Sequence, residues 1–249
     1  LNLTGWPYFV RGNGGILLVG DKGYRGVVIR LGRAFENVKM EGNRLTCGAA
    51  VSLAKAARTA MENGFSGLEF ASGIPGSVGG GVRMNAGAYG GELGNLVETV
   101  LVMAKDGSLM ELDNDTMEFG YRKSVLKDRP YAVLEVTMKL QEGNREEILA
   151  RMNELADRRR QKQPLEYASA GSTFKRPEGN FAGKLIMDAG LRGLRIGGAR
   201  VSDKHCSFII NDGTATAADI AELIEEVSER VKEKFGVSLE PEVIFLGDF

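Results

Sequence analysis

Nine glycines fall within the 24 residues from Ala71 to Gly94. Each glycine costs conformational entropy when it is ordered, so a folded chain keeps such a density only where the backbone needs it. A flexible linker would add Ser, Gln and charged residues, whereas this segment interleaves apolar side chains such as Ile74, Val78 and Val82. The segment is therefore predicted to be a packed loop whose backbone approaches something closely.

A smaller glycine cluster surrounds Arg11-Gly12-Asn13-Gly14-Gly15, which lies between the apolar residues 8–10 and 16–19. Consecutive glycine amides can point the same way and form an anion-binding nest for a diphosphate. The segment is not a Rossmann fingerprint, because residues 16–19 after it are strand-like, and the chain has no Gly-Lys-Ser/Thr of a P-loop. A simple hairpin connection explains this loop as well as an anion site does.

The remaining sequence predicts short strands and helices in mixed order. Strands are expected at 27–29, 97–104, 108–112, 132–140 and 242–246, and helices at 53–61, 146–161 and 220–235. Ser52 can cap the first helix, Gly64 suits its end, and Gly236 stops the last one. Asp106-Gly107 is typical of a hairpin turn. Because the strands neither alternate strictly with helices nor segregate from them, the α+β class is favoured.

Composition excludes several classes of protein. Of 249 residues, 43% are apolar and 26% charged, which suits a globular chain with one large domain or two small ones. The 32 basic and 33 acidic residues argue against nucleic acid or an anionic membrane as the main partner. No apolar run approaches the ~18 residues that span a bilayer. Residues 1–4 show no signal-peptide features, and the lack of an initiator Met is expected of a fragment or a processed chain.

The cysteines and the histidine give no reason to expect a metal. Cys47 and Cys206 lack metal-ligand spacing, and His205 is the only histidine. Cys206 is expected to be a buried strand residue. Two isolated cysteines fit a reducing compartment, so the expected location is the cytoplasm. A composition shift near Gln163-Pro164 predicts a boundary with a compact unit downstream.

The longer glycine segment carries an ordered motif. Gly73-Ile74-Pro75-Gly76-Ser77-Val78-Gly79-Gly80 is followed by Met84-Asn85-Ala86-Gly87-Ala88-Tyr89-Gly90-Gly91-Glu92. This run resembles the flavin loop of the UDP-N-acetylenolpyruvoylglucosamine reductases, the MurB family of peptidoglycan synthesis. Further matching segments lie at 120–124, 169–177, 189–199 and 239–243, so the resemblance covers essentially the whole chain.

The resemblance implies an FAD-binding fold of the vanillyl-alcohol-oxidase/PCMH type plus a smaller α+β substrate-binding domain. Residues 1–165, rejoined by 241–249, would form the FAD-binding region, and residues 166–240 the substrate-binding domain. The short stretch between the predicted strand at 132–140 and Ser169 leaves no obvious room for a tyrosine-loop insertion. The shorter of the two family types is therefore implied.

Two departures from the family pattern concern the diphosphate side of the implied FAD site. The family usually has further residues before the equivalent of Trp6-Pro7-Tyr8-Phe9, and they are absent here. Gly15 and Ile16 stand where the first glycine loop usually has Ser and Asn. We therefore expect FAD affinity to be the property most affected.

The resemblance also implies a reaction in two steps. NADPH reduces bound FAD, and the reduced flavin passes hydride to the enolpyruvyl double bond of UDP-N-acetylglucosamine enolpyruvate, giving UDP-N-acetylmuramate. The implied partners are a UDP-sugar and NADPH, and the chain is expected to be a monomer. The implied cofactor-binding residues are Gly12, Asn13, Gly14, Gly73, Ile74, Pro75, Gly76, Ser77, Gly79, Gly80, Asn85, Gly87 and Ala88.

Three residues match the family's catalytic positions. Hydride addition leaves an enolate, which needs a proton donor and a stabilising charge. Ser172 matches the proton donor, although Ser-Ala-Gly-Ser is also typical of a turn. Arg122 lies in a Tyr-Arg-x-Ser motif, where a guanidinium suits a carboxylate that gains charge and a solvated loop arginine is the alternative. Glu242 matches the C-terminal glutamate, with a sheet-edge charge as the alternative and Glu240 as a neighbouring competitor.

The implied substrate-binding residues are basic or polar. Lys162 ends the basic run 158–162 and matches a family lysine that binds phosphate. Cations at a helix C-terminus also interact favourably with the helix dipole, so the arginines at 158–160 are assigned to a solvated face. Arg176 and His205 complete the set, and His205 is expected to form a polar wall of the substrate domain.

Two other functions remain open at this point. One is another FAD oxidoreductase of the same fold that acts on an alcohol or hydroxy acid, which the linked Arg122, Ser172 and Glu242 motifs disfavour. The other is a non-catalytic nucleotide-binding protein. The departures from the family pattern at the start of the chain and at Gly15-Ile16 are the reason to retain this alternative.

Overall fold

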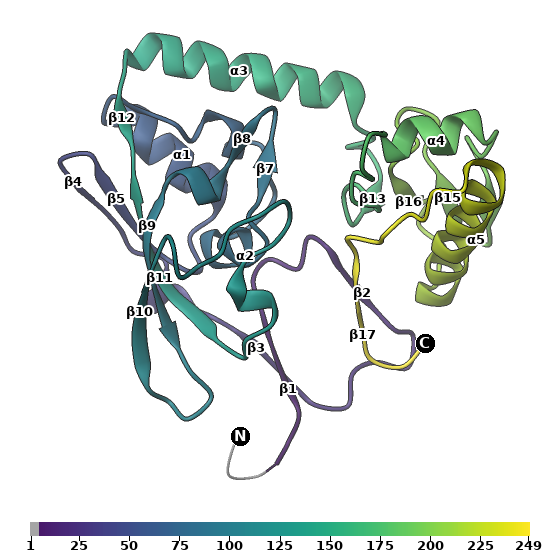
Figure 1. The fold of residues 1–249 in the computed structure, drawn as a ribbon, viewed down its shortest axis with the longest axis horizontal. Helices are drawn as coiled ribbons and strands as arrows, with labels where there is room; N and C mark the ends of the chain where they lie inside the picture. Colours follow the sequence, from purple (N-terminus) through teal and green to yellow (C-terminus); the bar gives the residue numbers. More distant parts are fainter. Residues whose placement is uncertain (1–4) are drawn as a thin grey trace. The chain divides into compact units, whose positions relative to one another are not determined.

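The computed structural model describes residues 5–249 (Figure 1). The expectations about a signal peptide and the start of the chain rest on residues 1–4, which lie outside the described residues. The chain forms two compact units. The first contains residues up to 14 and 26–158, and the second contains 15–25 and 159–249.

The first unit is built on a five-stranded antiparallel sheet in the order β10-β9-β11-β5-β4. Its strands are β4 (Val38–Glu41), β5 (Arg44–Gly48), β9 (Val97–Met103), β10 (Leu109–Asp113) and β11 (Ala132–Lys139). The predicted hairpin at Asp106-Gly107 is confirmed, with Leu109 opposite Met103. The predicted strand at 132–140 is β11, which lies in the centre of the sheet and pairs with β9 and β5.

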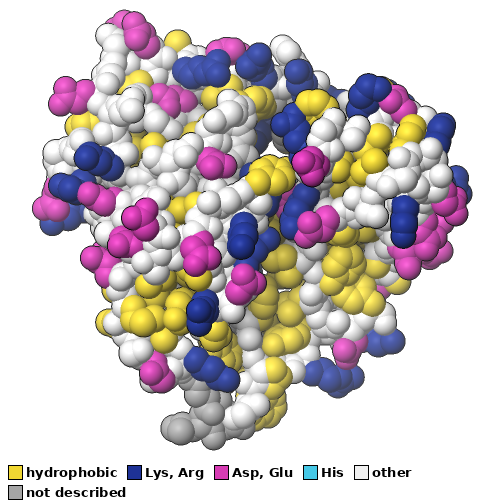
Figure 2. Space-filling model, viewed as in Figure 1, with side chains coloured by type: hydrophobic (Ala, Val, Ile, Leu, Met, Phe, Trp, Pro, Cys, Tyr) yellow, Lys and Arg dark blue, Asp and Glu magenta, His cyan; other side chains and the backbone are white. Residues whose placement is uncertain are grey.

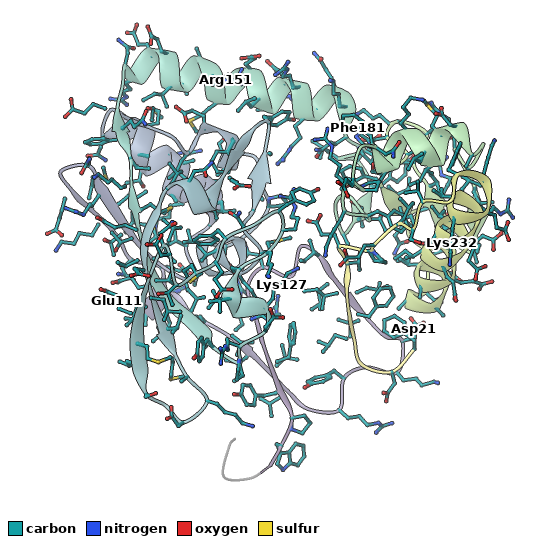
Figure 3. The ribbon with its side chains drawn as sticks, in the orientation of Figure 1. Asp21, Glu111, Lys127, Arg151, Phe181 and Lys232 are labelled. Atoms are coloured by element: carbon teal, nitrogen blue, oxygen red, sulfur yellow. The ribbon has the colours of Figure 1, made fainter. Side chains whose placement is uncertain are left out.

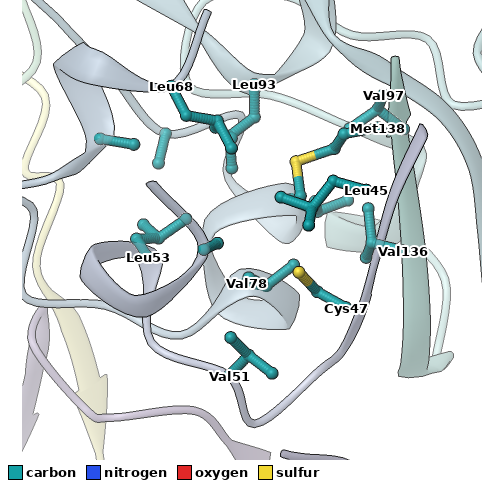
Figure 4. Packing of buried hydrophobic residues seen from close by; sticks show 14 of the residues in the cluster. Leu45, Cys47, Val51, Leu53, Leu68, Val78, Leu93, Val97, Val136 and Met138 are labelled. Atoms are coloured by element: carbon teal, nitrogen blue, oxygen red, sulfur yellow. The ribbon is translucent and has the colours of Figure 1, made fainter. Parts of the chain in front are cut away.

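Two helices cover this sheet, α1 (Leu53–Glu62) and α2 (Val78–Arg83), and both contact β5. Ser52 caps α1 as predicted, because its Oγ accepts a hydrogen bond from Lys55 N at 3.1 Å. Fully buried side chains of α1, α2 and the sheet form one core (Figure 4), whose largest members include Leu45, Leu53 and Met138. Gly79, Gly80 and Gly81 of the long segment therefore belong to a helix, which corrects the prediction of a loop throughout.

Smaller elements complete the first unit. β1 (Tyr8–Arg11) runs parallel to β3 (Val27–Arg30), β6 (Phe65–Ser66) pairs with β12 (Gln141–Glu142), and β7 (Gly87–Ala88) pairs with β8 (Gly91–Glu92). Single 3-10 turns are η1 (Arg33–Phe35), η2 (Glu69–Ala71), η3 (Leu93–Asn95) and η4 (Val125–Lys127). The predicted strand at 27–29 is β3. The predicted helix at 146–161 is α3 (Arg145–Lys162), which begins in the first unit and ends in the second.

The second unit has a four-stranded antiparallel sheet in the order β13-β16-β15-β14. Its elements are β2 (Leu17–Val19), β13 (Ala168–Ser169), α4 (Ala182–Asp188), β14 (Arg195–Ile196), β15 (Ala199–Val201), β16 (Ile209–Asn211), α5 (Ala217–Phe235) and β17 (Ile244–Leu246). α5 packs on the sheet and on α4 through Leu223, Val227 and Val231. The predicted closing strand is β17, and it runs parallel to β2.

The first turn of α5 is held from both sides. Thr216 Oγ1 accepts from Asp219 N at 3.0 Å, and the Asp219 carboxylate accepts from Thr216 N, which completes a capping box. Asp21, on the segment that leads away from β2, accepts from Ala217 N at 2.8 Å and Ala218 N at 2.9 Å (Figure 3). Two of the orphan N–H groups of α5 thus depend on a carboxylate from the other end of the chain.

Charged side chains of both signs are intermixed on the face shown in Figure 2, in line with the 32 basic and 33 acidic residues. Within residues 5–249, no helix combines the length and the apolar character that crossing a membrane requires. The assignment of FAD binding to 1–165 with 241–249, and of substrate binding to 166–240, stays a prediction. The compact units divide the chain differently, with 15–25 and 241–249 both in the second unit.

We expect Asp21→Ala to lower the free energy of unfolding of the second unit by about 1–2 kcal/mol, because two helix N–H groups lose their acceptor. Urea denaturation followed by circular dichroism measures this change. Glu233→Ala, the same change on the exposed last turn of α5, is the control and should cost nothing. Equal stability of the two variants would show that water replaces Asp21 without loss.

Candidate functional site

The first unit contains a cleft with a volume of about 930 Å³, within the range of cofactor sites. Its walls come from residues 5–13, from β3 and η1, from residues 49–50, from α2 and its N-cap, from the turn between β9 and β10, and from residues 129–134. Segments from six separate parts of the sequence therefore converge on one concave surface.

The cleft suits an anionic ligand with aromatic parts. Its basic lining residues are Arg11, Arg30, Arg83, Lys105 and Arg129, whereas its acidic ones are Glu36 and Asp106. The excess of cations favours a phosphate or diphosphate group. Trp6, Tyr8, Phe9, Phe35 and Tyr131 also line the cleft. These rings provide apolar surface for a planar ring system.

The two glycine segments meet at the cleft wall. A Cβ on Gly12 would collide with Ser77 Oγ, and a Cβ on Gly79 would lie 2.8 Å from the Ala49 Cβ. Ser77 is buried, and its Oγ accepts from Gly80 N at 3.3 Å. A side chain at position 12 or 79 would not fit this junction, so the backbones of the two glycine segments pack closely together in the cleft wall. These observations fit a dinucleotide such as FAD.

The predicted cofactor-binding residues divide into two groups. The cleft is lined by Gly12, Asn13, Ser77, Gly79 and Gly80. The lining does not include Gly14, Gly73, Ile74, Pro75, Gly76, Asn85, Gly87 or Ala88. Within the second group, Gly76 instead supports α1, since its carbonyl accepts from Leu53 N at 2.9 Å. The cofactor contacts of both groups stay predictions.

Asn85 holds the second half of the glycine segment in place. It is fully buried and has a φ of +46°, in the left-handed region. Its Nδ2 donates to Gly120 O at 2.9 Å, and its Oδ1 accepts from Gly94 N at 2.7 Å. One side chain thus joins the hairpin of β7 and β8 to the loop that carries the Tyr-Arg-x-Ser motif.

Arg122 lies on that loop and also has a left-handed backbone, with a φ of +54°. Its Nη2 donates to Gly87 O at 3.0 Å, and its guanidinium carbon lies 5.2 Å from the centre of the Tyr121 ring. Glu118 and Tyr89 are the other non-glycine residues with positive φ in residues 5–249. All such residues of the described chain therefore fall between 85 and 122, and backbone strain of this kind concentrates at functional sites.

Ser172 and Glu242 lie close together in the second unit. Between them, Thr173 O accepts from Glu242 N at 2.8 Å, and Thr173 N donates to Ser207 O at 2.7 Å. Thr173 Oγ1 also accepts from Ile209 N at 3.0 Å. Ser172 is half-buried, with its Oγ 3.5 Å from Phe174 O. The segment is thereby fixed between the start of β16 and the approach to β17.

Glu240 has a separate partner from Glu242. Its carboxylate forms an ion pair with Lys175 Nζ, and its carbonyl accepts from Lys175 N at 2.9 Å. The sequence favours Glu242 over Glu240, because the Glu-Val position fits the family motif better. The catalytic role of Glu242 stays a prediction.

The predicted substrate-binding residues are on the surface of the second unit. Arg176 is exposed, and its guanidinium carbon lies 3.9 Å from the centre of the Phe181 ring, a cation–π contact. Lys162 is the exposed last residue of α3. Lys204 Nζ donates to Arg160 O at 2.8 Å, so the end of α3 and the turn before β16 are neighbours.

His205 is half-buried and held in one orientation. Its Nδ1 accepts from Ser207 N at 3.3 Å, so in the neutral ring the proton is on Nε2. Its ring meets the Phe208 ring edge-on, with centres 5.2 Å apart. Burial lowers the pKa of His205, and the nearby Lys162 lowers it further. His205 therefore presents a neutral N–H donor at neutral pH.

Two expectations about single residues are wrong. Arg159 does not lie on a solvated face, because its Nε and Nη1 are buried and have no hydrogen-bond partner within residues 5–249. Helical spacing carried the signal that was missed, because Arg159 follows Ile148, Met152 and Leu155 on the same helix face. Cys206 is buried as expected but belongs to the turn before β16 rather than to a strand. No group of three or more His, Cys, Asp or Glu side chains in the described chain is arranged to hold a metal ion.

Comparison with known proteins agrees with this arrangement. Residues 163–246 match the family model "UDP-N-acetylenolpyruvoylglucosamine reductase, C-terminal domain", and residues 1–113 match "FAD binding domain". The reductase of Lachnoclostridium phytofermentans is 50% identical over 246 residues, which are 97% of this chain and 79% of that protein. The reductase of Caldanaerobacter subterraneus is 51% identical over 242 residues, 97% of this chain and 80% of that protein.

The chain belongs to the UDP-N-acetylenolpyruvoylglucosamine reductase family. Among solved structures, the MurB reductase of Thermus caldophilus superimposes with a TM-score of 0.86 at 42% identity, covering 98% of this chain and 86% of that one. The predicted α+β class, an FAD-binding fold with a smaller α+β domain, is confirmed, and its assignment to the vanillyl-alcohol-oxidase/PCMH type stays a prediction. This reductase is an oxidoreductase with FAD as its cofactor, as predicted.

We expect Asn85→Ala to lower the free energy of unfolding of this reductase by about 2–4 kcal/mol, because the Gly94 N–H and the Gly120 carbonyl lose their buried partner. Denaturant unfolding measures this loss. Asn85→Gly separates the two causes, since glycine removes the cost of the left-handed backbone without restoring the hydrogen bonds. Full stability in the glycine variant would mean that the side chain contributes nothing.

We expect acid to destabilise the second unit through His205. At neutral pH His205 is uncharged in both the folded and the unfolded chain. As the pH falls below about 6.5, the unfolded chain gains a proton that burial keeps out of the folded one. The melting temperature should therefore fall more steeply between pH 7 and pH 5 in the parent protein than in His205→Gln. Parallel curves for the two proteins would contradict this assignment.

Proposed function

We propose that this chain converts UDP-N-acetylglucosamine enolpyruvate to UDP-N-acetylmuramate with NADPH as the reductant, and that Arg122, Ser172 and Glu242 perform the chemistry on the substrate. The observation that carries the proposal is the junction of Gly12, Ser77 and Gly79 at a basic cleft in a chain of this family. FAD, when bound, supplies the hydride chemistry that amino-acid side chains lack.

Backbone groups of Gly12, Asn13, Ser77, Gly79 and Gly80 hold the diphosphate of the cofactor in this proposal. Glycine backbone lets phosphate oxygens approach closely, and the surrounding arginines neutralise their charge. The aromatic lining of the cleft excludes water around the ring systems. The chain's contribution at this point is to bind and orient the cofactor.

Arg122 binds the carboxylate of the enolpyruvyl group. When hydride adds to one carbon of the double bond, negative charge spreads from the neighbouring carbon onto this carboxylate. A guanidinium fork can donate two parallel hydrogen bonds to it. The hydrogen bond from Nη2 to Gly87 O and the left-handed backbone keep the side chain anchored on the loop, which supports a fixed role.

Ser172 supplies the proton that completes the reduction. Its O–H bond breaks as a C–H bond forms at the carbanion carbon, and solvent returns a proton to the serine oxygen. Three hydrogen bonds fix the backbone and hydroxyl of the adjacent Thr173, which supports a positioned hydroxyl. In this proposal Glu242, whose backbone N–H donates to Thr173 O, orients the same intermediate.

Lys162, Arg176 and His205 bind the UDP part of the substrate in this proposal. A primary ammonium, a guanidinium and a neutral N–H donor together suit phosphate and sugar oxygens. The second unit thus recognises the nucleotide sugar. We also propose a cytoplasmic location, where UDP-sugars and NADPH are available, and a monomeric state.

We expect Ser172→Ala to leave reduction of bound FAD by NADPH unchanged and to slow reduction of the substrate by about 10²- to 10⁴-fold, because only the second step needs the proton. Anaerobic stopped-flow absorbance of the flavin separates the two steps. Ser169→Ala, the same change three residues earlier on an exposed strand, is the control and should reduce substrate normally. If Ser172→Ala slows both steps equally, Ser172 is structural.

A simpler measurement tests the proposal as a whole. The purified protein, supplied with FAD, should become yellow and should oxidise NADPH in the presence of UDP-N-acetylglucosamine enolpyruvate. Uptake of FAD with turnover of an alcohol or hydroxy acid in place of this substrate would favour another oxidoreductase. A protein that stays colourless with added FAD would contradict the proposed enzyme.

A further inference from the structure

Arg83 is a charged residue on the cleft wall with an unusual setting. It is the last residue of α2 and lines the cleft beside Gly79 and Gly80. Its Nη1 donates to Leu126 O, and its Nη2 lies 3.4 Å from Lys127 O. Burial lowers the pKa of its guanidinium, and Asp128 opposes this change from a distance. Neutral carbonyls are the hydrogen-bond partners that hold this cation.

The backbone of Arg83 contacts the same segment. Its carbonyl accepts from Ser124 Oγ at 2.6 Å, and Ser124 is fully buried. The side chain and the backbone carbonyl of Arg83 therefore both form hydrogen bonds with residues 124–127, which form the turn η4 and its N-cap. Leu126, at the centre of this turn, is fully buried in the core of the first unit.

Residues 83–87 and 120–127 together form a continuous seam of hydrogen bonds. Asn85 Nδ2 donates to Gly120 O, and Arg122 Nη2 donates to Gly87 O. The hydrogen bonds of Arg83 with Ser124 and Leu126 form the other end of this seam. Arg122 lies between the two ends, two residues from Gly120 and two from Ser124. Its left-handed backbone is held from both sides.

Arg83 is the member of this seam that also lines the cleft. A desolvated cation in a partly enclosed site attracts an anionic ligand strongly. When the cleft is filled, water leaves the free side of the guanidinium, and its hydrogen bonds to the carbonyls of η4 strengthen. The occupancy of the cleft can therefore act on the loop of Arg122 through one side chain.

We infer that Arg83 is a positioning residue, which couples occupancy of the FAD cleft to the backbone of residues 120–127 and so to the placement of Arg122. The inference rests on the proposed role of Arg122 in the reaction. Lysine at this position would keep the charge but lose the fork that reaches two carbonyls. Methionine at this position would keep much of the side-chain volume and lose both the charge and the hydrogen-bonding fork.

Hydrogen exchange with and without saturating FAD tests the coupling directly. In the parent protein, FAD should slow exchange of the amides in 120–128. In Arg83→Met, at FAD concentrations that still saturate the cleft, this added protection should disappear, and in Arg83→Lys it should be reduced. Arg30→Met removes a different cleft cation with no contact to the seam, so it should weaken FAD binding and keep the protection.

The same variants should separate the two steps of the reaction. Arg83→Met should reduce substrate about 10- to 100-fold more slowly, because Arg122 is misplaced, and this loss should exceed any loss in the rate at which NADPH reduces its flavin. Persistent FAD-dependent protection in Arg83→Met, or equal loss of both steps, would overturn the inference. If Arg122→Lys reduces substrate at the parent rate, the proposed role of Arg122 fails, whatever the exchange of the Arg83 variants shows.

Discussion

The buried side chain of Asn85 is the contact on which the candidate site most depends. A left-handed asparagine inside the core is costly unless both of its polar ends are satisfied, and here they are satisfied by two different segments. The hairpin of β7 and β8 is therefore fixed relative to the loop of Arg122. The seam and the left-handed backbone between residues 85 and 122 are consequences of closing these segments on one another.

In the second unit, too, a buried polar residue joins separate segments through its hydrogen bonds. The N–H, the carbonyl and the hydroxyl of Thr173 form hydrogen bonds with three different strands or turns. Ser172 directly precedes this fixed residue, and Glu242 is bonded to its carbonyl. In both units, the side chains proposed to be catalytic belong to backbone that is held by buried hydrogen bonds. Such support restricts a catalytic group to few orientations.

Local signals in the sequence predicted much of this fold. Ser52 and Gly236 mark helix ends because capping needs only neighbouring residues. The helix through Gly79–Gly81 was missed because glycine is a poor helix former, and tertiary packing overrides that preference: a Cβ on Gly81 would lie 2.8 Å from Leu93 Cδ1. The cap from Asp21 to Ala217 could not be predicted either, since no local pattern joins residues so distant in sequence. The cleft lining from β3, from the β9–β10 turn and from 129–134 was missed for the same reason.

The parallel pairing of β2 with β17 places Leu17 opposite Ile244, nearly the whole length of the chain apart. Contacts between such distant residues form late, because a long loop must close first. During synthesis the second unit therefore cannot be completed until the last residues have left the ribosome. A piece cut at the α3 boundary would carry β17 without its neighbour, and its exposed strand edge would be open to aggregation.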